Sequence, residues 1–176
     1  MDLHYEYCDH DEYSDDLKNL PEQLKNWILE AAELYFEKGI GLKLKVRLLD
    51  AFIEKLTRGK TNNSDFLGGE LGTYIIVESD GTYNPLDTLK INQDVDKTCS
   101  VFTHSPGQYL STDIFRKWVD MTSVFPSPCQ DCDMVYLCGG YYLPTRYGKN
   151  NGYDNESTYC EQLYALSEYV DRSFSK

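Results

Sequence analysis

Four cysteines in the last third of this 176-residue chain have the residue type and spacing of a metal-binding set. Cys129 and Cys132 are separated by two residues. Cys138 follows after five more residues and Cys160 after a further 21. Two cysteines at the shorter spacing can bind one centre from a single tight turn, and the later two can complete the set from other segments. Two disulfides, or four unrelated buried thiols, are the alternative interpretations of the same pattern.

Two kinds of metal centre are compatible with four thiolates. Zinc sites usually pair two short chelating units, whereas Cys138 and Cys160 stand alone. An iron–sulfur cluster is a larger object, and its ligands can be spread over a loop that surrounds it. Gly139 and Gly140 follow Cys138 directly, and glycines allow backbone amides to approach and hydrogen-bond the sulfides of a cluster. The spacing therefore favours an iron–sulfur cluster and leaves zinc open.

The composition excludes several kinds of partner. The chain has 29 acidic and 17 basic residues, a formal net charge of −12, and no run rich in Lys or Arg. Nucleic acids and anionic membranes bind cationic faces, so we expect neither as a partner. The acidic residues 1–16 resemble no secretory signal and are expected to be a solvated lead-in. No run of about 18 apolar residues predicts a membrane helix. We expect a cytoplasmic protein, and a reducing cytosol favours metal-bound over disulfide-bonded cysteines.

The elements that must position these cysteines begin with a helix–strand–helix pattern. Asn19 is a candidate N-cap, Pro21 fits the first turn, and Gly39 fits the end of the first helix. Alternating apolar residues predict a half-buried strand over residues 42–46. A second amphipathic helix follows it. The residues at helical spacing in the two helices are Leu24, Trp27, Ile28, Ala31, Leu34 and Tyr35, then Val46, Leu49, Phe52, Ile53 and Leu56.

A polar segment over residues 58–69 predicts a boundary between two domains, 1–69 and 70–176. The second domain is predicted to open with a β-hairpin over residues 73–84, turning at Gly81. A short helix over residues 112–120 and a C-terminal helix from 161 to about 172 follow. The first is capped by Thr112 and turns Ile114, Phe115 and Trp118 inward, and the second has a stripe of Leu163, Leu166, Tyr169 and Val170. The predicted fold class is α+β.

A family resemblance is carried by the stretch CQDCDMVYLCGGYYLPTRYGKNNGYDNESTYCEQLYAL, which begins at Cys129. It resembles the C-terminal signature of SPASM domains, the auxiliary-cluster domains of radical S-adenosylmethionine enzymes that modify ribosomally synthesised peptides. Its part CGGYYLPTRYGKNNGYDNESTYC is especially similar to maturases of the cyclophane-forming, FxsB-like kind. The hairpin ESDGTYNPLDTLK is similar to the usual start of that domain. Residues 20–56 resemble the helix–strand–helix that finishes the preceding partial TIM barrel.

The resemblance implies one auxiliary [4Fe–4S] cluster, with Gly139, Gly140 and Arg146 lying behind its ligands. The implied ligands are Cys129, Cys132, Cys138 and Cys160. A seven-cysteine SPASM domain has a further cysteine where this chain has Tyr142, and another just after the hairpin strand, where this chain has Pro85, Leu86 and Asp87. The four implied ligands thus correspond to the second auxiliary cluster of such domains, and a first auxiliary cluster is not expected. Cys8 and Cys99 are expected to be buried or free thiols.

The sequence also lacks the C-x3-C-x2-C triad that this superfamily uses to cleave S-adenosylmethionine, so we expect no such cleavage by this chain alone. The leading hypothesis is an auxiliary-cluster module, a fragment or one half of a split enzyme. Its expected partners are a precursor peptide and a radical SAM barrel subunit, which would bind S-adenosylmethionine. One alternative is a non-enzymatic, zinc-stabilised module that binds proteins or peptides. Another is an acidic, tyrosine-rich surface that binds a basic peptide, with the cysteines empty.

Overall fold

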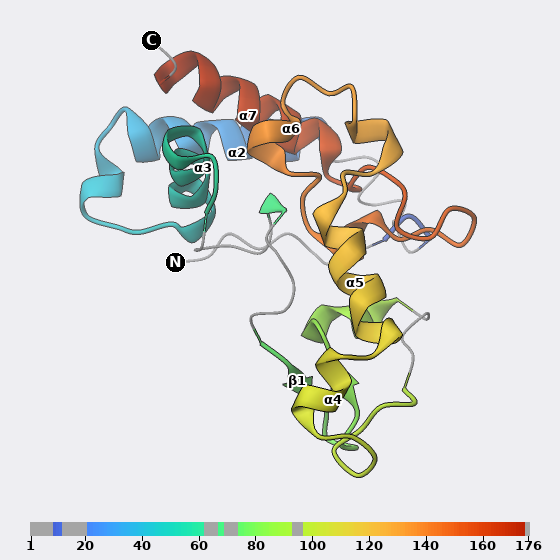
Figure 1. Cartoon of the computed structure of the whole chain (residues 1–176). Coiled ribbons are helices and arrows are strands. Elements are labelled where there is room, and N and C mark those ends of the chain that lie inside the picture. The colour runs from blue at the N-terminus through green and yellow to red at the C-terminus, as the bar shows by residue number, and fades with distance from the viewer. Residues whose placement is uncertain (1–8, 12–20, 62–66, 69–73, 93–96, 175–176) are drawn as a thin grey trace. The chain divides into compact units, whose positions relative to one another are not determined.

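The computed structural model describes residues 9–11, 21–61, 67–68, 74–92 and 97–174 (Figure 1). It is rich in helix, with a short antiparallel hairpin, in agreement with the predicted α+β class. The chain forms two compact units. The first combines residues 1–69 with 126–176, and the second contains residues 70–125. The boundary predicted at residue 69 coincides with one division between the units, but the structure divides the predicted domain 70–176 after residue 125.

The first unit, which we call the cysteine unit, is built from helices. Helix α2 packs against α7, and α3 packs against both α6 and α7 (Figure 1). Its helical segments are α2 (Pro21–Phe36), η1 (Ile40–Leu42), α3 (Arg47–Arg58), η4 (Ser127–Cys129), α6 (Val135–Cys138), η5 (Leu143–Arg146) and α7 (Cys160–Phe174). Fully buried apolar side chains that form its core are Ile28, Ala32, Leu49, Phe52, Leu137, Leu163, Leu166 and Val170.

Helix α2 confirms the first predicted helix, and the proposed cap Asn19 lies outside the described residues. Its buried line is Ile28, Ala32 and Tyr35, at the i, i+4, i+7 spacing of one narrow face. Trp27, expected on the buried stripe, is instead 47% exposed. A single packed helix, α7, covers only a narrow line of α2, so the wider apolar stripe is not buried in full.

The strand predicted over residues 42–46 is wrong. Residues up to Leu42 form the 3-10 helix η1, and Leu42 itself is 91% exposed. The backbone N–H of Val46 donates to the Tyr35 hydroxyl at 3.3 Å, and that hydroxyl donates to Asp50 Oδ1 at 2.9 Å. A side chain of α2 therefore accepts the hydrogen bond that a neighbouring strand would have accepted. The barrel-like helix–strand–helix is not found in this form, although its second helix is confirmed as α3.

The second unit, which we call the hairpin unit, contains the predicted hairpin. Strand β1 (Ile76–Val77) pairs antiparallel with β2 (Tyr83–Asn84). Gly81 has a φ of +85°, which a residue with a side chain rarely adopts, so the turn needs glycine there. The N–H of Tyr83 donates to the Cys99 carbonyl at 3.0 Å, which adds a third segment beside the hairpin.

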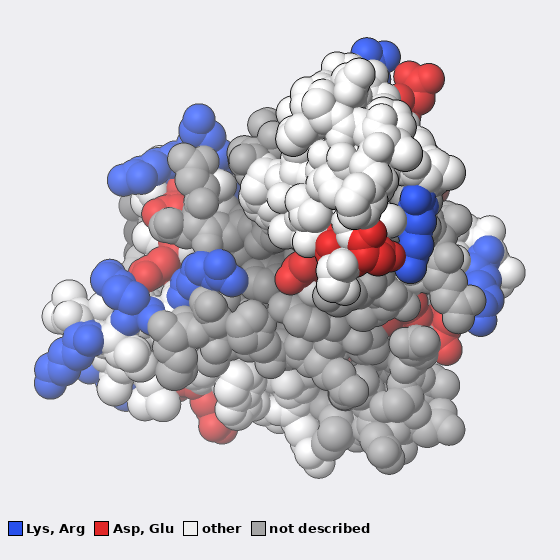
Figure 2. Space-filling view, turned by 90° about the horizontal axis from the view of Figure 1, so that it is seen from below, with Lys and Arg blue, Asp and Glu red and all other residues white. Residues whose placement is uncertain are grey.

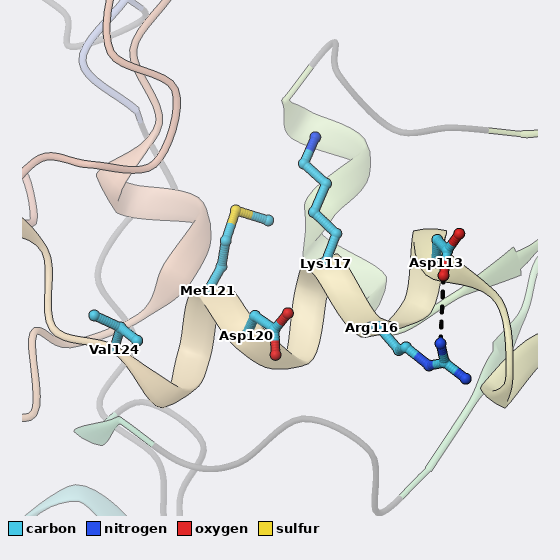
Figure 3. A pocket seen from close by; sticks show the side chains of 6 residues that line it. All are labelled: Asp113, Arg116, Lys117, Asp120, Met121 and Val124. Atoms are coloured by element: carbon cyan, nitrogen blue, oxygen red, sulfur yellow. Dashed lines mark hydrogen bonds and ion pairs between the residues drawn. The ribbon is translucent and has the colours of Figure 1, made fainter.

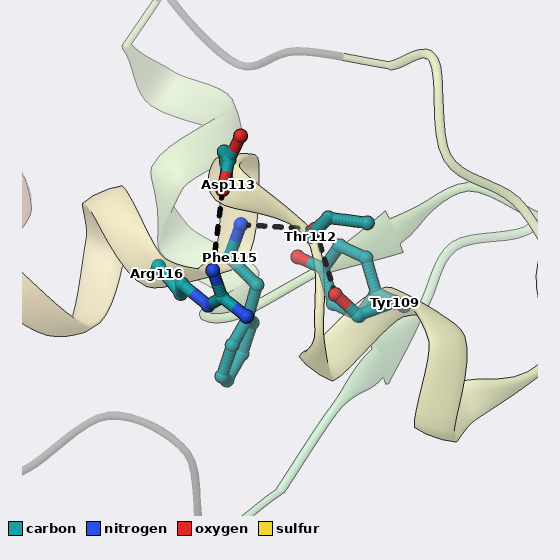
Figure 4. Close-up of polar contacts among 5 residues, drawn as sticks. All are labelled: Tyr109, Thr112, Asp113, Phe115 and Arg116. Carbon is teal, nitrogen blue, oxygen red and sulfur yellow. Dashed lines mark hydrogen bonds and ion pairs between the residues drawn. The ribbon is translucent and has the colours of Figure 1, made fainter.

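Three helical segments follow in the described part of the hairpin unit, η3 (Asp87–Ile91), α4 (Pro106–Leu110) and α5 (Asp113–Ser123). The Thr112 hydroxyl accepts from the Phe115 N–H at 3.2 Å, so the predicted cap of α5 is confirmed (Figure 4). Phe115 and Trp118 are buried, also as predicted. The Tyr109 ring lies 4.9 Å from the Tyr83 ring and 5.3 Å from the Phe115 ring, centroid to centroid, and these rings form the core of the unit.

The C-terminal helix is confirmed as α7. Leu163, Leu166 and Val170 of its predicted stripe are fully buried. Tyr169 lies at the edge of this stripe, where its hydroxyl donates to Glu37 Oε1 at 2.9 Å. Among the described residues, no helix has both the length and the apolar character needed to cross a membrane.

Candidate cysteine site

The first two cysteines lie on one tight turn, as their spacing predicts. Cys129 is the last residue of η4, and its N–H donates to the Pro126 carbonyl at 2.8 Å. The Cys132 N–H donates in turn to the Cys129 carbonyl at 3.2 Å. Asp154 holds the start of this turn, because its two carboxylate oxygens accept from the Ser127 N–H at 2.6 Å and from the Ser127 hydroxyl at 2.8 Å. These two hydrogen bonds hold the pKa of the Asp154 carboxyl below its usual range.

Cys138 ends α6 and is followed by three consecutive residues in the left-handed region. Their φ angles are +68° at Gly139, +74° at Gly140 and +58° at Tyr141. Tyr141 is the non-glycine residue with positive φ in the described chain, and its N–H donates to the Cys138 carbonyl at 3.1 Å. The left-handed run reverses the chain and lets the Gly140 N–H donate to the Cys138 sulfur, which counteracts the rise in its pKa. This is the role expected of glycines beside a ligand.

Cys160 enters the same region as the first residue of α7. Its N–H donates to the carbonyl of Ser157, a buried residue. The Ser157 hydroxyl shares a 2.8 Å hydrogen bond with the Thr145 hydroxyl and accepts from the Tyr159 N–H at 3.1 Å. These buried contacts connect the start of α7 to η5. They hold the backbone of Cys160 in place relative to η5.

Three of the four thiols, those of Cys129, Cys138 and Cys160, have a raised pKa. Burial is the largest cause of the rise in the pKa of Cys138 to about 12, followed by the charges of Cys160 and Cys129. Burial likewise raises the pKa of Cys160 to about 11, with further contributions from Cys129, Glu156 and Cys132. Since Cys160 and Cys129 raise the pKa of Cys138, and Cys129 and Cys132 raise that of Cys160, these side chains lie in one region of the cysteine unit. Their role as a ligand set stays a prediction. Without a positive centre, the raised pKa values keep Cys138 and Cys160 protonated near neutral pH.

Arg146 is a buried cation beside this set. It is 5% exposed, and its Nε and Nη2 donate to the Tyr153 carbonyl at 3.1 and 2.9 Å. Burial lowers the pKa of Arg146, while Cys129 and Asp154 raise it. Reciprocally, the positive charge of Arg146 acts on Cys129, where it counteracts the rise in pKa that burial causes. The Arg146 charge therefore acts on Cys129, and its role beside a cluster stays a prediction.

Lys55, on α3, is a second buried cation, and the sequence analysis missed it. Its Nζ donates to the Leu67 carbonyl at 2.7 Å, and its charge counteracts the rise in the pKa of Cys138. A signal for it was present in the sequence. Lys55 is seven residues after Leu48 and three after Phe52, on the buried stripe of α3, where a lysine is rarely found without a partner.

The backbones of two glycines cross between α3 and the cysteine turn. A Cβ on Gly139 would lie 2.3 Å from the Leu67 carbonyl oxygen and 2.8 Å from Lys55 Nζ. A Cβ on Gly68 would lie 2.6 Å from the Gly139 carbonyl oxygen. Only residues without a side chain fit at this crossing. This crossing adds a backbone contact to the packing of α2 on α7 and of α3 on α6 and α7, which joins the same two segments.

Part of the N-terminal lead-in is also bound to this region, in contrast to the expected solvated segment. The His10 N–H donates to the Tyr147 carbonyl at 2.9 Å, and His10 Nε2 pairs with the Glu156 carbonyl at 2.8 Å. The Lys149 N–H donates to Asp11 Oδ2 at 2.9 Å. Charge alone could not predict this, because the contacts are made mostly to the backbone of a loop distant in sequence.

The remaining cysteines differ from these four. Cys99 is a buried free thiol in the aromatic core of the hairpin unit, as expected, and Cys8 lies outside the described residues. All five cysteines in the described ranges are free, so none of them forms a disulfide with another. Within the same ranges, no three His, Cys, Asp or Glu side chains stand in an arrangement that could hold a metal ion.

Charged side chains gather at two other places on the described surface. A shallow pocket on the hairpin unit is lined by one face of α5 alone, with the mixed charges Asp113, Arg116, Lys117 and Asp120 (Figure 3). Arg116 already pairs with Asp113 at 3.4 Å. On the face shown in Figure 2, basic and acidic side chains are interspersed among the coloured residues and form no single cationic patch there. Neither feature has the convergent chemistry of the cysteine region.

Comparison with known proteins identifies a fold. No family model matches the chain, and no curated protein matches it. Solved structures do resemble it. Native anSMEcpe with bound AdoMet and the Cp18Cys peptide has a TM-score of 0.68 at 21% identity, over 89% of this chain and 42% of that chain. Native anSMEcpe with bound AdoMet has a TM-score of 0.69 at 20% identity, over 98% and 44%. The chain thus has the fold of somewhat less than half of these solved chains.

Proposed function

We propose that this chain is an auxiliary-cluster module of a radical SAM peptide-modifying system, and that Cys129, Cys132, Cys138 and Cys160 hold one [4Fe–4S] cluster in it. The observation that carries the proposal is the gathering of four thiols with a backbone amide and two buried cations. The SPASM-like signature over the same residues supports it. The likeness in fold to structures that contain AdoMet and peptide is consistent with it.

The donor set fits a tetrathiolate cluster in three respects. Neighbouring cysteines raise the pKa of Cys129, Cys138 and Cys160, the Gly140 N–H donates to the Cys138 sulfur, and Lys55 and Arg146 place positive charge near Cys138 and Cys129. When bound, the cluster would supply one-electron redox capacity. Binding would also release the thiol protons, because thiolates are the ligands.

The module's own residues would hold and orient this centre. Gly139 and Gly140 make the turn that points a backbone amide at Cys138, and Arg146 would offset thiolate charge near Cys129. The partners proposed for the module are a precursor peptide and a separate radical SAM barrel, since AdoMet and peptide are bound in the solved structures. S-adenosylmethionine would enter only through the barrel partner.

The test is metal analysis of the full chain produced and purified without oxygen. We expect about four irons per chain and an equal amount of acid-labile sulfide. The protein should also show a broad absorbance at about 400 nm. Cys132→Ser and Cys138→Ser should lose this absorbance and most of the iron. Cys99→Ser is the matched control, because Cys99 belongs to the hairpin unit, and it should keep both. A colourless chain with one zinc would instead establish the zinc-stabilised interaction module.

The partner proposal has its own test. The cluster-loaded chain, immobilised, should retain a separately produced radical SAM barrel protein and the peptide encoded beside it. Retention should weaken when the iron-free Cys138→Ser chain is used. Equal retention by the two chains would separate peptide binding from the cluster and count against an auxiliary role for it.

A further inference from the structure

Lys55 is a buried ammonium on the stripe of α3 that otherwise carries apolar side chains. One hydrogen of its Nζ is donated to the Leu67 carbonyl at 2.7 Å. The same nitrogen lies 2.8 Å from the position of a Cβ on Gly139, the residue that follows Cys138. The ammonium is therefore confined between the end of α3 and the turn that carries one proposed ligand.

A buried ammonium is costly without a compensating negative charge. The Leu67 carbonyl supplies a dipole, which is weaker than a carboxylate partner. Burial accordingly lowers the pKa of Lys55, and the compensating charge that raises it is that of Cys138. The ammonium lies beside the backbone of Gly139, the residue next to Cys138, so a thiolate at Cys138 is the nearby negative charge that would compensate it.

We infer that Lys55 supplies a fixed positive charge to the cysteine set at Cys138, and that this charge raises the reduction potential of a cluster bound there. The inference rests on the proposed function. A cluster core with four thiolates carries net negative charge, and reduction by one electron makes it more negative. A buried cation beside one ligand stabilises the reduced state more than the oxidised state.

Arg146 provides the internal comparison. It lies beside Cys129, but both of its described hydrogen bonds go to the Tyr153 carbonyl in its own loop. Lys55 comes from α3, outside the segment that contains the four cysteines. The N-terminal helical segment therefore contributes a group to the proposed cluster site as well as a packing surface.

The experiment measures the reduction potential of the anaerobically prepared full chain by titration with dithionite in the presence of redox mediators. Lys55→Met removes the charge and keeps the length of the side chain, and Lys55→Gln retains a donor for Leu67. At a fixed potential, both should lower the ratio of reduced to oxidised cluster by on the order of tenfold, a shift of about 59 mV to more negative potential. Lys43→Met removes an exposed charge and should leave the potential unchanged.

Thermal unfolding gives a second readout that does not depend on electron transfer. Lys55→Met should lower the melting temperature of the metal-loaded chain, which loses a charge partner of the thiolates. In the metal-free, reduced chain the thiols are protonated, so the same change should raise the melting temperature or leave it unaltered. This reversal would occur with iron or with zinc as the metal, because both bind thiolates.

The outcomes separate the inference from the proposed function. Normal iron content with an unchanged potential in both Lys55 variants overturns the inference and leaves the proposed function standing. An equal shift in Lys43→Met also overturns it, since the effect would then be one of net charge. A wild-type chain that takes up no metal overturns the proposed function, and the inference with it. If Lys55→Met does not fold, Lys55→Gln decides.

Discussion

Each of the two units buries a cysteine, and the surroundings of the two thiols differ. Cys99 of the hairpin unit is 3% exposed and packs against the rings of Tyr83, Tyr109 and Phe115. Cys129 of the cysteine unit is 8% exposed, and its thiol is affected by Arg146, Cys132 and two carboxylates. The first environment is that of an inert core thiol, and the second is that of a potential ligand. Burial alone therefore does not distinguish a structural cysteine from a chemical one, whereas the neighbouring charges do.

The units also differ in what makes them stable. The hairpin unit relies on packed aromatic rings and on capped helices, which are ordinary local solutions. The cysteine unit depends at its site on a left-handed run and on a glycine crossing, where backbone approaches backbone. Substitutions in the hairpin unit should therefore act through lost packing. Substitutions at the glycines of the cysteine unit should act through steric clash.

The largest effect is expected from Gly139→Ala. The new Cβ would combine a positive φ with a 2.3 Å approach to the Leu67 carbonyl oxygen, a backbone atom that also accepts a hydrogen bond from Lys55 of α3. We expect a loss of about 4 kcal/mol in the free energy of unfolding. Urea unfolding followed by circular dichroism measures it. Gly152→Ala is the matched control, because it has a φ of +60° but no atom within 4 Å of the new Cβ, so it should cost only about 1 kcal/mol. Similar losses for both would contradict the tight crossing.

Phe115→Ala should destabilise the hairpin unit by about 3 kcal/mol, because it empties a ring-sized space next to Tyr109. The same change should accelerate alkylation of Cys99 and leave the metal content of the cysteine unit intact. Alkylation kinetics and iron analysis on one preparation measure both effects. Val124→Ala changes a side chain that is 62% exposed, so it should neither destabilise the hairpin unit nor accelerate alkylation of Cys99. Loss of metal in Phe115→Ala would show that the two regions are less independent than their cores indicate.

The pH dependence of stability should report on the buried thiols Cys138 and Cys160 of the cysteine unit. In the metal-free, reduced chain the folded-state pKa of Cys138 is about 12 and that of Cys160 about 11, both above the value of ~8.5 for a free thiol. These raised values contribute stability below about pH 8.5, and the contribution is lost as pH rises toward 11 to 12. We expect unfolding free energy to fall by about 1.4 kcal/mol per pH unit for each thiol in that interval.

Unfolding curves at several alkaline pH values measure this slope. Cys138→Ser should make the slope shallower, because serine does not titrate in the same interval. An unchanged slope in Cys138→Ser would contradict the assignment of the raised pKa to this thiol.

The smallest effect is expected at the start of α5. Thr112→Ala removes the hydroxyl that accepts from the Phe115 N–H, and should cost about 1 kcal/mol. Thr112→Ser retains the hydroxyl and should stay close to wild type. Thermal unfolding of the three proteins compares them. Equal melting temperatures for the alanine and serine variants would show that the cap contributes little to this unit.

Most helices and the hairpin could be predicted because their signals are local. The Thr112 cap, the turn at Gly81 and the apolar spacing of α7 each act within a few residues. The strand over residues 42–46 was predicted from the same kind of local pattern and failed. Alternation predicts a strand only when a partner strand can pair with it, and here Tyr35 accepts the hydrogen bond of Val46 instead.

In the candidate site too, residues with a local sequence signal could be predicted, and residues whose contacts are distant in sequence could not. The four cysteines, the glycines after Cys138 and Arg146 could be singled out because they are close together in sequence. His10 could not, because the loop that it contacts lies far along the chain from it. Lys55 stood out only as a lysine on an apolar stripe, and its neighbour Gly139 could not be predicted because it lies 84 residues away. Long-range contacts of this kind depend on how complete elements pack, which a single sequence does not encode in any short window.

By itself, the sequence determined which residues are candidates to bind a metal, the α+β character and most of the segments that become α-helices or turns. Each of these follows from residue chemistry or from spacing within about one helical turn. Only the tertiary structure decided that residues 126–176 join the first 69 residues, that Lys55 faces Cys138, and that Cys99 stays apart in an aromatic core. The physical reason is close packing. Gly68 and Gly139 can cross only because neither has a side chain, and that contact exists only once both segments have folded.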